Sequence, residues 1–302
     1  NATQGWIPTF DNAVADVPVT GNDNGIFGYG GGLSNLSNLV SNVGVVASDT
    51  SGVGSAREDL SACEYGGDKG IFGFGTTGSY TGITNLVNSS GVVATDVTGV
   101  GTARVGPAGC SYGSDKGIFA YGNTGSQTAL SNLVSNSGVV ASDVTGVGTA
   151  RSYLAACEYG DDKAIFAYGY TGSRVSMSNL VNSSGVVATD VTGVGTGRDA
   201  LAACSYGYDK GIFGYGYSSS NVSLTNLVSN VGVIGADVTG VGTARRGIAA
   251  CEYGKDKAIF GFGYDSGGRA GMTNLVSNAG VVATDVSAVG TVRNGLAACS
   301  YN

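Results

Sequence analysis

The chain has 302 residues, with 22 acidic and 15 basic side chains, no histidine and a net charge of −7. An acidic chain without a basic cluster is a poor partner for nucleic acid or an anionic membrane surface. Without histidine or any Cys-x-x-Cys pair, it carries no zinc or haem motif and lacks the commonest general base. We therefore expect no catalytic residue, no cofactor and no enzyme.

Residues 1–20 differ from the rest of the chain. They contain the only tryptophan and two of the three prolines, and the chain does not begin with Met. We find no signal peptide and no transmembrane run, and interpret the chain as a processed mature protein or a fragment. This N-terminal arm is either a strap on its own domain, a flexible segment, or a strand that docks on a neighbouring subunit through Trp6, Ile7 and Phe10.

From residue 21 to residue 302 the sequence repeats. The cysteines recur at steps of 47, 47, 47, 47 and 48 residues, which indicates a solenoid, an array or a propeller. Each unit has four short apolar runs separated by turn residues, and no run has the 3.6-residue period of a helix. This pattern predicts an all-β domain with about four strands per unit.

The two ends of the repeat region complement each other. The first copy lacks its opening strand and begins with Asn24-Gly25-Ile26-Phe27, whereas the last copy stops after that strand, at Ala298-Cys299-Ser300-Tyr301. Pairing these fragments would remove a free sheet edge. We therefore predict a closed six-bladed β-propeller at residues 21–302, with four-stranded blades of about 47 residues and residues 1–20 outside it.

The second strand of each unit suggests how the blades pack. Because side chains alternate between the faces of a strand, Phe166, Tyr168 and Tyr170 should share one face and smaller residues the other. Aromatic residues of one blade would then lie over glycines of the next.

The unit resembles a kelch-type propeller repeat. The resemblance rests on Arg-x-x-Leu-Ala-Ala, a turn, Asp-Lys-x-Ile-Phe-x-Tyr-Gly, and two further strands before the next arginine, over residues 21–302. The kelch double glycine corresponds to Tyr-Gly or Phe-Gly here, with Gly31-Gly32 in the first copy, and the kelch tryptophan is missing from every copy. The resemblance implies that the Leu-Ala-Ala-Cys strand is innermost and lines a central channel.

Charged residues recur once per repeat. An Asp-Lys pair after the first strand predicts a hairpin turn in which Asp caps its own backbone. We interpret the recurring arginines and the aspartates eight residues before them as ion pairs or backbone clamps at blade boundaries, with a binding site repeated six times as the alternative. The arginines are Arg57, Arg104, Arg151, Arg198, Arg245 and Arg293.

The cysteines allow two interpretations. They are buried free thiols on the inner strand, or they pair between neighbouring blades, as Cys63–Cys110, Cys157–Cys204 and Cys251–Cys299 or in the opposite phase. The residue after each cysteine alternates between glutamate and serine, so the repeat is a double unit of about 94 residues.

If the inner strands face a channel, Glu64, Glu158 and Glu252 form an alternating ring there. We interpret this ring as a solvated channel lining and expect no metal, with bound Ca²⁺ as the minor alternative.

Five Asn-x-Ser/Thr sequons are candidate glycosylation sites, and the Ser/Thr-rich loops offer O-linked positions. The sequons are Asn1, Asn35, Asn88, Asn182 and Asn221.

Near-identical repeats, few charges, one unusual arm and no unique site favour a structural or assembly protein. We expect a secreted or virion-surface protein that self-associates through residues 1–20, such as a fibre subunit built by head-to-tail contacts. The alternative is a lectin-like adhesin or phage receptor-binding propeller with a glycan site in each blade, since the loops at 78–81, 125–128 and 172–175 differ while the framework stays constant. An intracellular kelch-like scaffold is a third interpretation.

Overall fold

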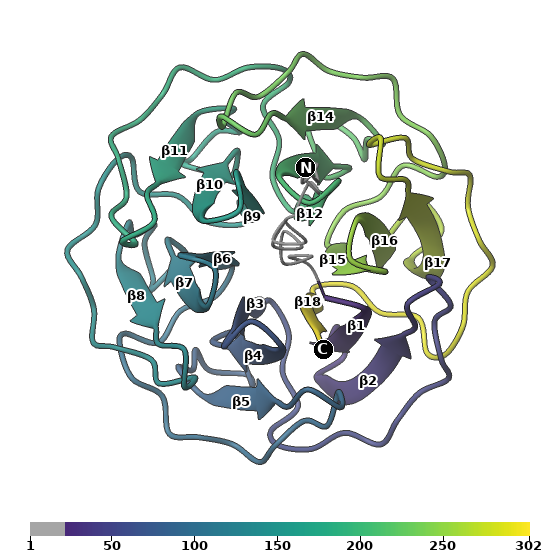
Figure 1. The fold of residues 1–302 in the computed structure, drawn as a ribbon, viewed down its shortest axis with the longest axis horizontal. Helices are drawn as coiled ribbons and strands as arrows, with labels where there is room; N and C mark the ends of the chain where they lie inside the picture. Colours follow the sequence, from purple (N-terminus) through teal and green to yellow (C-terminus); the bar gives the residue numbers. More distant parts are fainter. Residues whose placement is uncertain (1–21) are drawn as a thin grey trace, which may run out of the picture.

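The computed structural model describes residues 22–302, so the predicted arm, with Trp6, Ile7 and Phe10, and the sequon at Asn1 lie outside the described residues. The described part is all-β, with no helix in residues 22–302. Its strands form six three-stranded antiparallel sheets in repeating units, and Figure 1 shows these sheets arranged around a central axis. The arrangement is propeller-like.

Each sheet combines an inner, a middle and an outer strand. In that order the sheets are β18 (Ala297–Tyr301), β1 (Asn24–Gly30), β2 (Ser34–Val40); β3 (Ser61–Tyr65), β4 (Lys69–Gly73), β5 (Thr84–Val87); β6 (Ala108–Tyr112), β7 (Lys116–Ala120), β8 (Ser131–Val134); β9 (Ala155–Tyr159), β10 (Lys163–Ala167), β11 (Ser178–Val181); β12 (Ala202–Tyr206), β13 (Lys210–Gly214), β14 (Thr225–Val228); and β15 (Ala249–Tyr253), β16 (Lys257–Tyr264), β17 (Arg269–Val276).

The last strand of the chain completes the first sheet. β18 pairs antiparallel with β1, with Tyr301 opposite Asn24 and Cys299 opposite Ile26, as the complementary ends of the repeat predicted. Each inner strand also contacts the inner strands of both neighbouring sheets, and β18 contacts β15 and β3. The Leu-Ala-Ala-Cys segment is therefore the innermost part of each sheet.

The expected fourth strand is not a regular strand. The fourth apolar run pairs with the third strand only through isolated bridges, such as Val40 with Val46 and Ser37 with Thr50. The two bridges are three residues apart along the third strand, from Ser37 to Val40, but four residues apart along the outer segment, from Val46 to Thr50. The register therefore shifts by one residue, as at a β-bulge, and no continuous ladder forms. The prediction of four-stranded blades was wrong for this reason.

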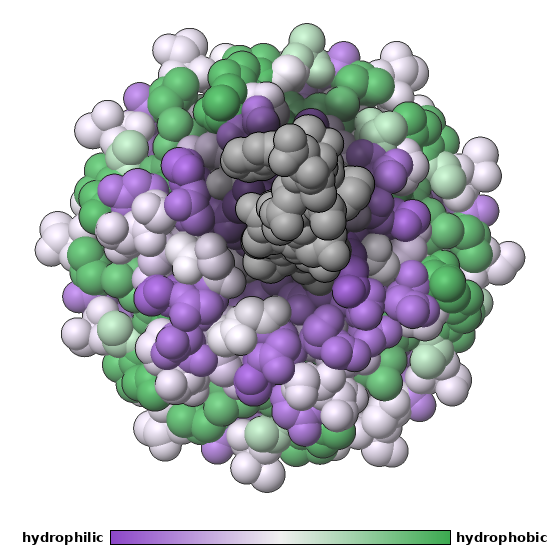
Figure 2. Space-filling view, viewed as in Figure 1, coloured by the Kyte–Doolittle hydropathy of each residue, from purple (hydrophilic) through white to green (hydrophobic). Residues whose placement is uncertain are grey.

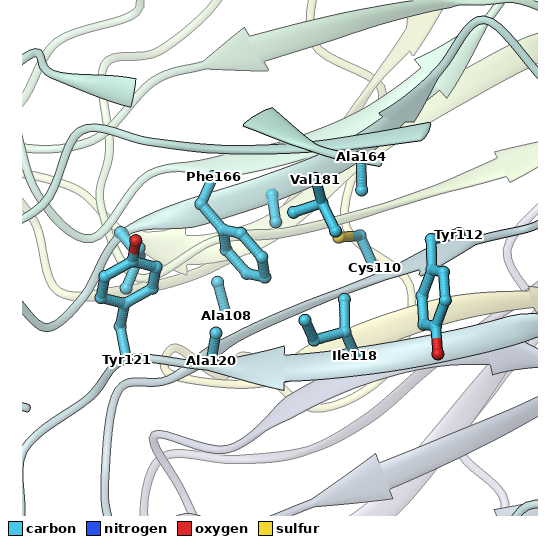
Figure 3. Close-up of a cluster of buried hydrophobic side chains, with 11 residues drawn as sticks. Ala108, Cys110, Tyr112, Ile118, Ala120, Tyr121, Ala164, Phe166 and Val181 are labelled. Carbon is cyan, nitrogen blue, oxygen red and sulfur yellow. The ribbon is translucent and has the colours of Figure 1, made fainter. Parts of the chain in front are cut away.

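Aromatic residues do pack over the small residues of neighbouring sheets. A Cβ atom added to Gly28 would stand 2.7 Å from Phe72 of the next sheet, and one on Gly261 would stand 2.7 Å from Phe27. Figure 3 shows an equivalent cluster, in which Phe166 lies beside Ala120 and Tyr121 of the preceding sheet. The prediction of aromatic residues lying over glycines is confirmed.

The predicted shared face of Phe166 and Tyr168 was wrong. Phe166 packs edge-on against Tyr121 of the preceding sheet, with ring centroids 5.5 Å apart, whereas Tyr168 packs in the same way against Phe213 of the following sheet at 5.4 Å. Tyr168 has a φ of +67° and follows the last residue of β10, so strand alternation no longer applies to it.

Candidate functional site

The six recurring arginines are completely buried between the sheets. Arg151 illustrates their contacts: its Nε donates to the Tyr168 carbonyl at 2.9 Å, its Nη1 to the Thr149 carbonyl at 3.1 Å, and its Nη2 to Asn179 Oδ1 at 2.6 Å. Its guanidinium also stacks on the ring of Tyr121, 4.2 Å from the centroid. One arginine thus joins two sheets by charge-assisted hydrogen bonds and a cation–π contact.

An aspartate completes this set of contacts. We call the arginine, the asparagine that accepts from it and this aspartate the clamp. Asp190 accepts hydrogen bonds from Asn179 Nδ2 at 2.9 Å and Thr149 Oγ1 at 2.6 Å, and lies 3.9 Å from Arg151 Nη1. Burial raises its pKa, but the hydrogen bonds and Arg151 outweigh burial and hold the pKa below its usual value. The recurring arginines and aspartates thus form ion pairs, as the sequence predicted, but Arg151 is paired with Asp190, the aspartate that follows it, and not with the aspartate eight residues before it.

The clamp recurs around the molecule with Arg–Asp separations of 3.5–3.9 Å. The other ion pairs are Arg104–Asp143, Arg198–Asp237, Arg245–Asp285 and Arg293–Asp49. Because these guanidinium groups have no exposed surface, they cannot contact a ligand in solution.

The clamp at Arg57 is incomplete. Arg57 Nε donates to the Phe74 carbonyl at 3.1 Å, but within residues 22–302 neither Arg57 Nη2 nor Asn85 Oδ1 has a hydrogen-bond partner. Asn85 Nδ2 still donates to Ala94 O and to Asp96 Oδ1, both at 3.0 Å. This repeat thus lacks the Arg–Asn bond that the other five have.

The inner strands surround a channel whose wide mouth is a cavity of about 430 Å³. Asn22 and Asn302 line this mouth, so both ends of the described chain lie there, and Asp23 N donates to Asn302 O at 2.9 Å. Figure 2 shows that hydrophilic residues gather around the axis on this face. The ends occupy the place that the Asp-Lys turns fill in the other repeats.

The turns around this mouth are joined by backbone hydrogen bonds. Gly66 N donates to Asp115 O of the next repeat at 2.7 Å, and the same bond recurs in each repeat until Asn302 N donates to Asp68 O at 3.0 Å. We call these six bonds the wide-mouth belt.

Glutamate and serine alternate just inside the wide mouth. Glu64, Glu158 and Glu252 line the cavity together with Ser111 and Ser205. This is the alternating ring that the sequence predicted.

The surroundings of the three glutamates raise their pKa values. Burial raises the pKa of all three, and mutual repulsion raises those of Glu158 and Glu252 further, while serine hydroxyls partly oppose the shift. Glu64 also accepts hydrogen bonds from Asn22 Nδ2 at 3.0 Å and Ser300 N at 3.2 Å.

The glutamates do not form the Ca²⁺ site considered from the sequence. Within residues 22–302, no three His, Cys, Asp or Glu side chains are arranged to hold a metal ion. The serines between the glutamates separate the carboxylates around the channel.

The six cysteines are buried free thiols: Cys63, Cys110, Cys157, Cys204, Cys251 and Cys299. Their sulfur atoms pack sideways against the next sheet: a Cβ on Gly117 would stand 2.5 Å from Cys63 Sγ, and one on Gly211 would stand 2.4 Å from Cys157 Sγ. Burial raises the thiol pKa in each case. The structure thus has none of the disulfides considered as the second interpretation.

The sequons differ in their surroundings. Asn88 and Asn182 are exposed, and each uses its Oδ1 to cap the following turn. Asn35 and Asn221 are half-buried, and their Nδ2 atoms donate to Gly54 O at 2.9 Å and Tyr264 O at 3.0 Å. Since a glycan attaches to Nδ2, Asn88 and Asn182 are the more accessible candidates.

The opposite end of the channel is encircled by a second set of backbone hydrogen bonds, the narrow-mouth belt. Here each residue donates its N–H to the equivalent carbonyl one repeat earlier at 2.7–2.9 Å, and Asp59 N closes the circle by donating to Gly295 O. Its members all have positive φ and are Asp59, Gly106, Tyr153, Ala200, Gly247 and Gly295.

Sequence reasoning missed both belts and the asparagine of the clamp. The asparagine signal was present, because an Asn-Leu-Val run recurs with the same period and its asparagine is completely buried. The belts join backbone atoms, so residue types alone do not identify which carbonyl each N–H group meets.

No protein-family model matches the chain, and a search of curated proteins finds no match. The part of the chain that the structure describes has no helix of the length and apolarity needed to cross a membrane.

Proposed function

We propose that the chain is a closed six-bladed β-propeller with a non-enzymatic role as a structural or assembly protein, and that it links into a fibre through residues 1–20. The observation that carries the proposal is the position of Asn22, the first described residue, which lines the wide mouth of the central channel in a disc-shaped frame. A segment that leaves a disc at the mouth of its central channel is placed to connect neighbouring discs along a common axis, and repeated head-to-tail contacts of this kind produce a filament.

Two further features support the closed frame. β18 completes the sheet of β1 and β2, and both hydrogen-bond belts return to their starting repeat. In the clamps, the recurring arginines and aspartates contact one another inside the protein. Such internal contacts are expected of a rigid building block.

The circumference supports an assembly role as well. Figure 2 shows hydrophobic residues along this edge, and each repeat has an equivalent valine with an exposed fraction of 60–65%. These valines are Val45, Val92, Val139, Val186, Val233 and Val281. Such periodic apolar positions favour contacts with other copies or other surface components. We propose that the protein is located outside the cell or on a virion surface. We also propose that its resemblance to kelch repeats extends to the propeller architecture only.

Electron microscopy of the full chain and of a chain lacking residues 1–20 tests the proposal. We expect filaments of stacked discs that disappear on truncation, while the truncated protein keeps its fold by circular dichroism. Light scattering should show mass increasing with concentration only for the full chain. Single discs in both samples at every concentration would refute assembly through the arm.

One observation favours the lectin-like alternative. The variable loops contribute Arg174, which stacks on Tyr217 at 4.3 Å and pairs with Asp199 at 3.3 Å, so an aromatic ring and polar groups lie together beside the loops. Aromatic rings combined with hydrogen-bonding side chains suit a glycan. Binding of the truncated monomer to a glycan array, lost on Tyr217→Ala, would support this function instead.

A further inference from the structure

The narrow mouth holds a cavity of about 230 Å³ on the axis of the molecule, at the opposite end of the channel from Asn22 and Asn302. Its floor is a ring of aliphatic side chains, one from each repeat: Leu60, Pro107, Leu154, Leu201, Ile248 and Leu296. The narrow-mouth belt surrounds this floor, and the N–H groups of the belt are all used within it. The polarity of the cavity therefore comes from side chains.

The repeat is broken at this mouth. Four belt positions carry glycine or alanine, but Asp59 and Tyr153 place larger side chains at the rim. The Tyr153 ring covers Gly106, where an added Cβ would stand 2.9 Å from Tyr153 Cδ1, and its hydroxyl donates to Asp59 Oδ2 at 3.2 Å. One half of the cavity is thus walled by an aromatic ring and a carboxylate, and the other half by small residues.

Among residues 22–302, no basic side chain forms an ion pair with the carboxylate of Asp59. Its Oδ1 lies over Gly295, 2.7 Å from where a Cβ would stand, and accepts no hydrogen bond from residues 22–302. Burial, followed by repulsion from Glu58, raises the pKa of Asp59 to about 6, although the Tyr153 hydroxyl opposes the shift. Of the described residues that line the cavity, Arg246 is the only arginine, and it is held in a stack on Tyr217 and Tyr264, 4.6 and 5.5 Å from their centroids. The wall at Asp59 is therefore net negative.

We propose that this cavity binds small organic ammonium ions, with the ammonium group on Asp59 and the face of Tyr153, and the apolar part on the aliphatic floor. An ammonium group supplies the N–H donors that Asp59 Oδ1 lacks and interacts favourably with an aromatic face. A mostly apolar concave surface with a few convergent polar groups is the usual form of a small-molecule site. This activity goes beyond the structural role and does not depend on it.

Calorimetry of the full chain with benzylammonium chloride and with benzyl alcohol tests the proposal. We expect saturable binding of benzylammonium at millimolar concentration, and binding of the neutral alcohol weaker by about tenfold or more, as expected for loss of a charge-assisted hydrogen bond. Asp59→Asn should reduce benzylammonium binding by a similar factor and leave the alcohol unaffected. Asparagine tolerates the left-handed conformation of residue 59, where φ is +54°, so this variant should fold.

Glu58→Gln is the matched control, since Glu58 neighbours Asp59 but does not line the cavity, and its Oε2 accepts a hydrogen bond from Gly32 N at 3.2 Å. We expect benzylammonium binding by this variant to stay within about twofold of the unmodified chain. Absence of saturable binding, equal binding of alcohol and ammonium, or unchanged affinity in Asp59→Asn would each overturn the proposal. Melting temperatures of both variants distinguish these results from a folding defect.

Discussion

Removing one asparagine from a complete clamp should destabilise the protein more than removing its counterpart from the incomplete clamp. Asn179 accepts from Arg151 Nη2 at 2.6 Å and donates to Ala188 O and Asp190 Oδ1, both at 2.9 Å. Within residues 22–302, Asn85 makes only the two donor contacts, with Ala94 and Asp96. Both asparagines are completely buried, so Asn179→Ala and Asn85→Ala create comparable cavities.

The difference between the two variants isolates one hydrogen bond to a buried guanidinium. A hydrogen bond to a charged group contributes about 1.5–3 kcal/mol, and a neutral one about 1 kcal/mol. Asn85→Ala should therefore lower the free energy of unfolding by about 2.5–4 kcal/mol, and Asn179→Ala by about 4–7 kcal/mol. The expected difference is about 1.5–3 kcal/mol.

Urea unfolding followed by circular dichroism measures these free energies, and unchanged slopes with denaturant show that the unfolding transition is comparable between variants. The matched surface control is Asn136→Ala, which removes an exposed side chain bonded to Asp115 at 3.1 Å and should cost less than about 0.5 kcal/mol. Equal destabilisation by Asn179→Ala and Asn85→Ala would refute our account of the clamp.

Three further predictions follow from the channel and the chain ends. Deleting residues 297–302 removes β18 and leaves the inner edge of β1 unpaired, so we expect loss of cooperative melting and aggregation on size exclusion; a monomer with an unchanged melt would contradict a closed ring. A thiol reagent should react slowly with the native chain, because burial raises the cysteine pKa values, and should count six thiols after unfolding; a lower count would reveal disulfides. Glu158→Gln should stabilise the fold at neutral pH. Since the folded pKa of Glu158 is raised, its ionisation on raising the pH costs stability, so the advantage of glutamine should shrink as the pH falls from the raised folded pKa toward the unfolded value of about 4.3, and should be absent below it; an advantage independent of pH would contradict this reasoning.

The sequence predicted the repeat, the all-β class and the pairing of the last strand with the first copy, because these depend on periodic side-chain patterns. It also predicted the packing of aromatic residues over glycines, as at Gly28 and Phe72, and the alternating glutamates in the channel. Each of these follows from residue type and spacing alone.

Other features depend on backbone conformation, which the pattern does not reveal. The left-handed φ at Tyr168 moved its ring to the face opposite Phe166. The register slip between Val46 and Thr50 prevented a fourth strand. The pairing of Arg151 with Asp190, rather than with the aspartate before it, depends on how neighbouring sheets approach each other, so spacing along the chain could not identify it.

The narrow-mouth belt also determines the electric field at that end of the channel. Its hydrogen bonds all run in the same sense around the axis, so the dipoles of the participating N–H and C=O groups follow one another like arrows on a circle. Six such vectors, related by rotation, cancel in the plane of the ring. A helix terminus, by contrast, collects aligned peptide dipoles into a partial charge of roughly half an electron. The belt therefore adds little in-plane field at this rim, and an approaching ion responds mainly to the charged side chains there, Asp59 and Arg246.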